Sequence, residues 1–323
     1  MLRLRTLQLF KRHFNSFLRH NTPAKLKNLC FIYYQFWKGG TNIKGYPFEI
    51  IIDPTNICNL RCPLCVTGQH NNVRTHGMMA FEEFIRIIED LKRWLYKVRF
   101  YSWGEPLLNE DIYRMISYAN INNIGTELST NFHQFSSQDL EKLIDSGLEL
   151  LIISFDGAKD ETYQKYRIGG NFYRVIDNIK ILLNEKTLKS IRFPIVEIQF
   201  LVMKHNEHEI KDIKKLAKEL GVDRLRIAPI TLNTRDPKQV NEWLPIDEKW
   251  SRYDYQTLED KIYRKRKRCE WLWRSVVINW DSTISPCCVF EGPHTDFGTL
   301  REKLFQNIFY LGFNAYQMQQ FKT

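Results

Sequence analysis

The stretch Cys58-Asn59-Leu60-Arg61-Cys62-Pro63-Leu64-Cys65 places three thiols on one short loop, with no fourth cysteine nearby. It directly follows residues 48–53, an apolar run with the length and composition of a buried strand. Iron–sulfur clusters are normally held by four cysteines, so three thiols predict a cluster with one iron open to another ligand. The alternative for this loop is a zinc knuckle completed by His70 or His76.

Strands and helices alternate from this point onward. The sequence predicts six strands, at residues 48–53, 98–103, 126–130, 150–155, 195–203 and 224–228. Amphipathic helices are expected between them, for example over residues 81–95 and 210–220, the second ending at Gly221, which suits a left-handed cap. Another helix, capped by Ser136 or Ser137, should end before Gly147. Strands alternating with helices imply a parallel sheet, either open or curved into a barrel.

One face of almost every expected strand is polar, and this distinguishes the two architectures. Glu197 and Gln199 alternate with apolar residues in the fifth strand, and Arg224 and Arg226 do so in the sixth. A parallel sheet covered by helices on both sides has two apolar faces. We therefore expect an α/β fold, a partial (β/α)6 TIM-like barrel with a polar lumen and with functional groups at the C-terminal strand ends.

The helix–strand rhythm fades after Pro229, which divides the chain into three parts. We expect a basic N-terminal arm over residues 1–46 and the barrel over residues 47–235. A linker and a small cysteine-containing C-terminal domain should occupy residues 236–323.

Cysteines and tryptophans mark the C-terminal part. Cys269, Cys287 and Cys288 are candidate metal ligands. We expect Trp271, Trp273 and Trp280 to pack around that metal site, because large aromatic side chains dominate small cores. Cys30, which lies in an apolar stretch of the N-terminal arm, is expected to be a buried thiol.

Composition and charge exclude several classes of protein. The 323 residues are 43% hydrophobic and 26% charged, as in globular proteins, and no apolar run approaches the ~20 residues of a membrane span. Without an export signal we expect a cytoplasmic location, where the seven cysteines stay reduced. Residues 1–40 hold eight basic residues and no acid, so most of the net charge of +10 is local and no nucleic-acid partner is expected. This arm should either lie on an anionic membrane or pack on the barrel.

The cysteine loop and several strand ends resemble the radical SAM superfamily, whose loop pattern is C-x3-C-x2-C. The resemblance covers roughly residues 47–320 and is strongest to the branch with a SPASM or Twitch extension. It implies a [4Fe–4S] cluster on Cys58, Cys62 and Cys65, with S-adenosylmethionine (SAM) bound at the open iron. The SAM-binding residues implied by the resemblance are Gly104, Glu105, Pro106, Ser129, Asn131, Ser154 and Arg167. The chemistry agrees, since an ammonium suits a Glu carboxylate and a carboxylate suits an Arg fork.

Two positions depart from the superfamily pattern. Trp103 stands where a glycine is usual and should narrow the pocket, and Leu64 stands where an aromatic residue is common.

The resemblance implies reductive cleavage of SAM to a 5′-deoxyadenosyl radical, which takes hydrogen from a peptide or a small metabolite such as a sugar. A flavodoxin or ferredoxin would supply the electron. Asp156, Glu197 and Arg226 are candidate catalytic residues, with a structural ion network as the alternative.

The C-terminal cysteines resemble the opening of a SPASM or Twitch domain, which implies an auxiliary iron–sulfur cluster. No cysteine follows Cys288, so we expect the thiols of this chain not to complete that cluster alone. A truncated chain, a non-cysteine ligand and an empty hairpin are the alternatives. The alternative functions are a zinc-stabilised binding protein and a radical SAM enzyme acting on RNA. The matches at Gly104-Glu105-Pro106 and residues 154–157 disfavour the first, and the confined positive charge disfavours the second.

Overall fold

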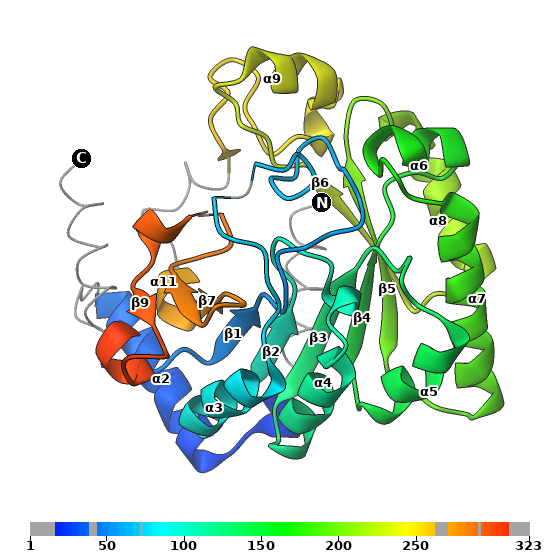
Figure 1. Ribbon diagram of the computed structural model, residues 1–323. Coiled ribbons are helices and arrows are strands. Elements are labelled where there is room, and N and C mark those ends of the chain that lie inside the picture. The colour runs from blue at the N-terminus through cyan, green and yellow to red at the C-terminus, as the bar shows by residue number, and fades with distance from the viewer. Residues whose placement is uncertain (1–16, 39–43, 72, 262–270, 290–291, 310–323) are drawn as a thin grey trace.

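The computed structural model describes residues 17–38, 44–71, 73–261, 271–289 and 292–309. Across these residues the centre of the protein is one nine-stranded sheet with the order β6-β5-β4-β3-β2-β1-β7-β8-β9 (Figure 1). The strands are β1 (Glu49–Ile52), β2 (Lys97–Phe100), β3 (Gly125–Thr130), β4 (Leu150–Ser154), β5 (Ile195–Val202), β6 (Arg224–Pro229), β7 (Ser275–Ile278), β8 (Thr283–Ser285) and β9 (Gly298–Thr299). The six expected strands are confirmed, and β1 to β6 pair in parallel.

The described α-helices are α2 (Pro23–Lys38), α3 (Phe81–Leu91), α4 (Ile112–Ile121), α5 (Ser137–Asp145), α6 (Asp160–Tyr166), α7 (Phe172–Leu188), α8 (Ile210–Leu220), α9 (Pro237–Trp243) and α11 (Trp271–Arg274). Helices α3, α4, α5, α7 and α8 cover one face of the sheet, whereas α9 lies beyond the strand ends (Figure 1). Helix α5 begins with a capping box between Ser136 and Asp139. Helix α8 ends at Gly221, whose φ of 75° is left-handed. Both expected caps are therefore confirmed.

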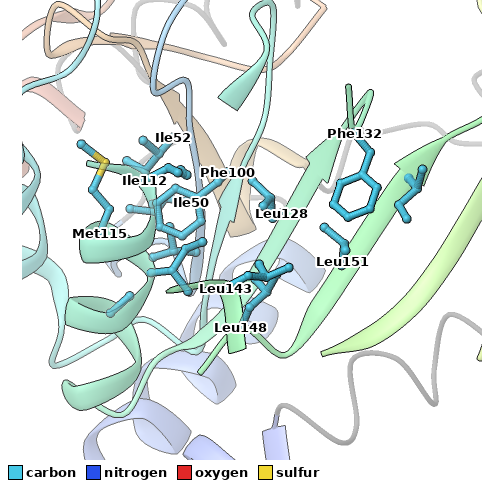
Figure 2. Close-up of a cluster of buried hydrophobic side chains, with 14 of the residues drawn as sticks. Ile50, Ile52, Phe100, Ile112, Met115, Leu128, Phe132, Leu143, Leu148 and Leu151 are labelled. Atoms are coloured by element: carbon cyan, nitrogen blue, oxygen red, sulfur yellow. The ribbon is translucent and has the colours of Figure 1, made fainter. Parts of the chain in front are cut away.

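The apolar face of the sheet packs against these helices and forms the main core. Figure 2 shows side chains of β1, β2, β3 and β4 meeting those of α4. Ile50, Phe100, Leu128 and Leu151 are fully buried there, as is Met115 of α4. Each such side chain contributes about 1.5–3 kcal/mol by leaving water, so this face holds the barrel together.

The opposite, inner face is polar, as the strand alternation predicts. Its charges are paired inside the barrel: Arg99 lies 2.8 Å from Glu49 and 3.8 Å from Glu127. Farther along the sheet, Arg226 of β6 lies 3.3 Å from Glu197 of β5. Buried charges require partners of this kind, because desolvation alone would be too costly. The partial barrel is therefore closed inside by ion pairs as well as by apolar contacts.

The C-terminal region extends the barrel sheet. Strand β7 pairs in parallel with β1, and β8 and β9 follow in antiparallel order. Trp273 packs edge to face against Phe36 of α2, and Trp271 lies over the guanidinium groups of Arg99 and Arg274. These contacts tie the two tryptophans to α2 and to β2 of the barrel. Within the described residues, the pairing of β7 with β1 therefore places the C-terminal part, expected from residue 236 onward, in the same sheet as the barrel.

Helix α2 packs under the sheet through one face. Lys25 donates to the carbonyl of Asn123 at 2.6 Å, and Asn28 exchanges hydrogen bonds with the backbone of Tyr46. Cys30 is exposed, so the expectation that it is buried is wrong; it lies on the outward face of the helix. The first 16 residues of the arm lie outside the described part. Among the helices that the structure describes, none is long and apolar enough to cross a membrane.

Candidate active site

The three-cysteine loop begins just beyond the C-terminal end of β1. Cys62 is 6% exposed, while Cys58 and Cys65 are half-buried. The amide of Cys65 donates to the carbonyl of Cys62, and the Gln69 side chain donates to that same carbonyl. A Cβ on Gly68 would lie 2.6 Å from the Cys62 nitrogen, so only glycine allows the loop to fold back this closely. The three thiols are therefore held on one compact loop.

Gly104 and Glu105 lie directly against the start of this loop. A Cβ on Gly104 would lie 1.8 Å from the carbonyl oxygen of Thr55, and the amide of Glu105 donates to the carbonyl of Ile57 at 2.8 Å. The end of β2 and the cysteine loop are thus in backbone contact. This contact explains why glycine precedes Glu105, because any side chain at position 104 would push the cysteine loop away.

Hydrogen-bond donors point at the cysteine sulfurs. The amide of Leu60 lies 3.4 Å from the Cys58 sulfur, and the Asn131 amide nitrogen lies 3.9 Å from it. The Arg167 Nη1 lies 3.8 Å from the Cys62 sulfur. Donors and positive charge around sulfur stabilise thiolates and tune the clusters that they hold. The loop is therefore built for ionised thiols.

Burial acts in the opposite direction and favours the protonated thiols when no metal is bound. Burial raises the pKa of Cys58 to about 12 and also raises the pKa of Cys62, against the effect of Arg167. Such thiols become ligands only when a metal displaces their protons. Within the described residues no three His, Cys, Asp or Glu side chains come close enough together to bind one metal ion.

Glu105 is a buried carboxylate at the centre of the strand ends. Its Oε1 accepts from the Leu107 amide and the Thr130 hydroxyl, and its Oε2 accepts from the Asn131 amide at 2.7 Å. Burial raises its pKa, while these hydrogen bonds act in the opposite direction. Asn131 continues the chain of contacts, because its side chain bonds Asn59 of the cysteine loop at 2.8 Å. Glu105 and Asn131 thus lie together beside the cluster loop.

Arg167 is held by Asp156. Its Nε and Nη2 donate to the Asp156 carboxylate at 2.7 and 2.5 Å, while Nη1 faces Cys62. Asp156 is completely buried and also accepts from the amide of Leu201. Burial disfavours the charged guanidinium, yet Asp156 keeps the pKa of Arg167 above its ordinary value. The sequence identifies both residues but not their pairing.

The remaining predicted residues occupy two separate places. Ser129 and Ser154 are half-buried, in β3 and at the C-terminal end of β4 respectively, and Pro106 begins a short 3₁₀ helix after β2. Glu197 and Arg226 form an ion pair on the inner face, which agrees with the structural alternative raised for them.

Sequence reasoning missed Tyr163. It is fully buried on α6, and its hydroxyl has no hydrogen-bond partner among the described residues. The amide of Arg167 donates to the carbonyl of Tyr163 at 2.9 Å, so Tyr163 lies one helical turn from a residue of the site. An orphaned buried donor fits a site that receives a polar ligand. Its position four residues before Arg167, about one turn earlier in the chain, is the sequence feature that points to it.

Arg74 was also missed. It lies 2.5 Å from Asp296 and 3.5 Å from Asp281, and so it ties the segment after the cysteines to the C-terminal hairpin. No local pattern predicts partners more than 200 residues away. A cavity of about 20 Å³ remains between Arg74, Trp103 and Asp53, at the position where Trp103 replaces glycine.

The C-terminal cysteines are only partly described. Cys287 and Cys288 are half-exposed in the turn that follows β8. Cys269 lies outside the described residues, so an auxiliary site on these three thiols stays a prediction.

Comparison with known proteins agrees with this geometry. Residues 52–217 match the radical SAM superfamily, and residues 269–322 match SPASM, an iron–sulfur cluster-binding domain. The Fe-coproporphyrin III synthase of Methanosarcina barkeri is 27% identical over 254 residues, which cover 78% of this chain and 59% of that protein. The chain spans about half the length of the curated relatives first matched.

Solved structures share the fold. Streptococcus suis SuiB bound to the precursor peptide SuiA has a TM-score of 0.63 and 18% identity, covering 90% of this chain and 70% of SuiB. The enzyme anSMEcpe with bound AdoMet and the Cp18Cys peptide has a TM-score of 0.61 and 18% identity, covering 84% of this chain and 82% of that one. A superfamily match over half of the sequence, on this fold and this three-thiol loop, shows that the chain belongs to the radical SAM superfamily of enzymes, whose cofactors are a [4Fe–4S] cluster and SAM.

Proposed function

We propose that this protein binds a [4Fe–4S] cluster through Cys58, Cys62 and Cys65 and uses SAM to generate a radical that acts on a peptide. The observation that carries the proposal is the convergence of the three thiols with Glu105 and Arg167 at one end of the barrel. When bound and reduced by a donor such as a ferredoxin or flavodoxin, the cluster supplies the electron that splits SAM into methionine and a 5′-deoxyadenosyl radical.

Glu105 is proposed to hold the amino group of SAM. Three of the four lone-pair positions of its carboxylate are taken by Leu107, Thr130 and Asn131. One position on Oε2 remains for an ammonium hydrogen. The existing hydrogen bonds fix the carboxylate in place before the ligand arrives, which lowers the entropic cost of binding.

Arg167 and Ser154 are proposed to hold the carboxylate of SAM. Asp156 occupies Nε and Nη2 of Arg167 and leaves Nη1, beside Cys62, as the nitrogen that can donate to a ligand. Asp156 is therefore a positioning residue that aims the guanidinium group at the cluster. We assign Glu197 and Arg226 a structural role within the ion pairs of the lumen.

The substrate class is argued from solved structures that share this fold. SuiB and anSMEcpe, which share this fold, have structures with bound peptides, and these favour a peptide. A small metabolite such as a sugar is the second candidate. We retain the division into an arm over residues 1–46, a barrel over 47–235 and a C-terminal domain over 236–323 as a proposal.

Formation of 5′-deoxyadenosine tests the proposed function. The reconstituted, reduced protein should convert SAM into this product under anaerobic conditions, and replacement of Cys58, Cys62 and Cys65 by Ala should abolish the conversion. A Cys287→Ala/Cys288→Ala variant is the matched control and should retain it. Equal product formation by the triple variant and the wild type would reject the proposal.

We also propose that the outward face of α2 contacts an anionic membrane. Phe31, Tyr34 and Trp37 are exposed along this face, Trp37 by 83%, and the helix contains three lysines and no acid. Aromatic and basic side chains together suit the membrane interface. Trp37→Ser should reduce partition onto anionic vesicles, whereas equal partition of the two proteins would exclude this face as the contact.

A further inference from the structure

A second cavity lies at the opposite end of the barrel from the cysteine loop. Its volume is about 330 Å³, near the lower limit for small-molecule sites. The first residues of several strands line it, among them Lys97 of β2 and Arg224 of β6, and the segment before α2 contributes Arg19. Because the cysteine loop follows the C-terminal end of β1, the length of the strands separates this cavity from the proposed SAM site (Figure 1).

The lining of this cavity is strongly basic. Four cationic side chains from four different segments meet there: Arg19, Lys97, Arg192 and Arg224. The lining holds one acid, Glu149, and that carboxylate is already bound by Arg19 and by His20, each at 2.7 Å. Lys97 is itself paired with Glu127 at 3.8 Å, so the excess positive charge of the cavity is carried by Arg192 and Arg224.

Two of these arginines have no acidic partner. Arg192 and Arg224 form no ion pair with any residue in the described parts of the chain. Glu197, which lies opposite Arg224 in the sheet, is 3.3 Å from Arg226 instead. Guanidinium groups that line a cavity and have no carboxylate partner are able to bind an external anion.

An aromatic ring adds an apolar wall. The guanidinium groups of Arg19 and Arg192 both lie over the Phe193 ring, at 4.4 and 5.4 Å from its centroid. Leu150 and Ile195 complete this side of the cavity. Stacking restricts the two arginines, so less conformational entropy is lost when they bind a ligand. The wall also gives the organic part of a ligand an apolar surface.

We infer that this cavity binds a small organic anion of the phosphomonoester class, at a site separate from the proposed SAM site. Arg192 and Arg224 bind the phosphate oxygens, and Phe193 with its aliphatic neighbours contacts the organic part. Arginine matches phosphate because its planar fork donates two parallel hydrogen bonds. The inference does not depend on the proposed radical chemistry.

Calorimetric titration of the full-length protein tests the inference. The probes are inorganic phosphate, glucose 6-phosphate and uncharged glucose. We expect saturable binding of glucose 6-phosphate, weaker binding of phosphate and none of glucose. The Arg192→Gln/Arg224→Gln variant should bind glucose 6-phosphate at least about tenfold more weakly, since each charge-assisted hydrogen bond is worth about 1.5–3 kcal/mol.

A matched control separates this site from general surface charge. Arg86→Gln removes a positive charge from an exposed position on α3 and should leave the affinity unchanged. The single variant Arg192→Gln, at an exposed loop position, serves if the double variant does not fold, and it too should weaken binding. Absence of saturable binding at millimolar concentrations would overturn the inference. So would equal affinity in the wild type and in a folded cavity variant.

Discussion

Replacing Gly104 by Ala should damage the cysteine loop from outside it. The added Cβ would lie 1.8 Å from the carbonyl oxygen of Thr55 and 2.8 Å from that of Ile57, whereas real Cβ contacts are essentially never under 3.0 Å. Both opposing atoms belong to the backbone, so no side chain can rotate to relieve the clash. The loop or the end of β2 must therefore move by about 1 Å.

The expected cost has two parts. Overpacking of this kind lowers the free energy of unfolding by about 1–3 kcal/mol. A displacement of about 1 Å at a reacting centre lowers activity by about 10²-fold. We therefore expect a Gly104→Ala protein that folds with reduced stability, takes up less iron during anaerobic reconstitution and forms 5′-deoxyadenosine about 10²-fold more slowly.

Gly221→Ala is the matched control. No atom lies within 4 Å of a Cβ at this position, and the substitution is strained only because φ is +75°. It should cost about 1–2 kcal/mol of stability while leaving the iron content unchanged. Denaturant unfolding together with iron and sulfide analysis distinguishes the two variants. Wild-type iron content and SAM cleavage in Gly104→Ala would refute the reasoning.

Three further predictions concern binding, packing and pH. Arg167→Ala should weaken SAM binding about tenfold or more in equilibrium dialysis while iron content stays intact, and unchanged affinity would remove Arg167 from the site. Phe100→Ala should lower the free energy of unfolding by about 3–5 kcal/mol in denaturant titrations; a loss under about 1 kcal/mol would contradict the packing shown in Figure 2. Burial raises the pKa of Asp53 from 3.8 to about 7, so the folded state binds the carboxyl proton more tightly than the unfolded state does. The free energy of unfolding should therefore fall as the pH rises from 3.8 to about 7. Asp53→Asn should flatten this part of the stability profile, and an unchanged decline would exclude Asp53 as its cause.

Periodicity was sufficient to predict the barrel. The alternation within residues 195–203 and 224–228 predicts both the strands and their polar face, because side chains of a strand point alternately to its two sides. Helix ends were predictable where a local residue determines them, as Gly221 does for α8. The cysteine loop was predictable because its three ligands lie within eight consecutive residues.

Long-range pairings were not predictable from the sequence. The parallel pairing of β7 with β1 joins segments more than 200 residues apart, and neither strand carries a local pattern that specifies its partner. The pairing of Asp156 with Arg167 depends on how α6 folds back over β4. Cys30 lies in an apolar run without clear amphipathic spacing, so its outward position follows from tertiary contacts of α2.

The central claim is that three thiolates hold a cluster whose fourth iron binds SAM. Electron–nuclear double resonance on the reduced protein, with SAM labelled by ¹⁵N at its amino group, tests this claim most directly. Three cysteine ligands and an open iron predict a nitrogen hyperfine coupling that appears with labelled SAM and is lost when Cys58, Cys62 and Cys65 are changed to Ala. SAM that binds in equilibrium dialysis to the cluster-containing protein but shows no such coupling would contradict the account.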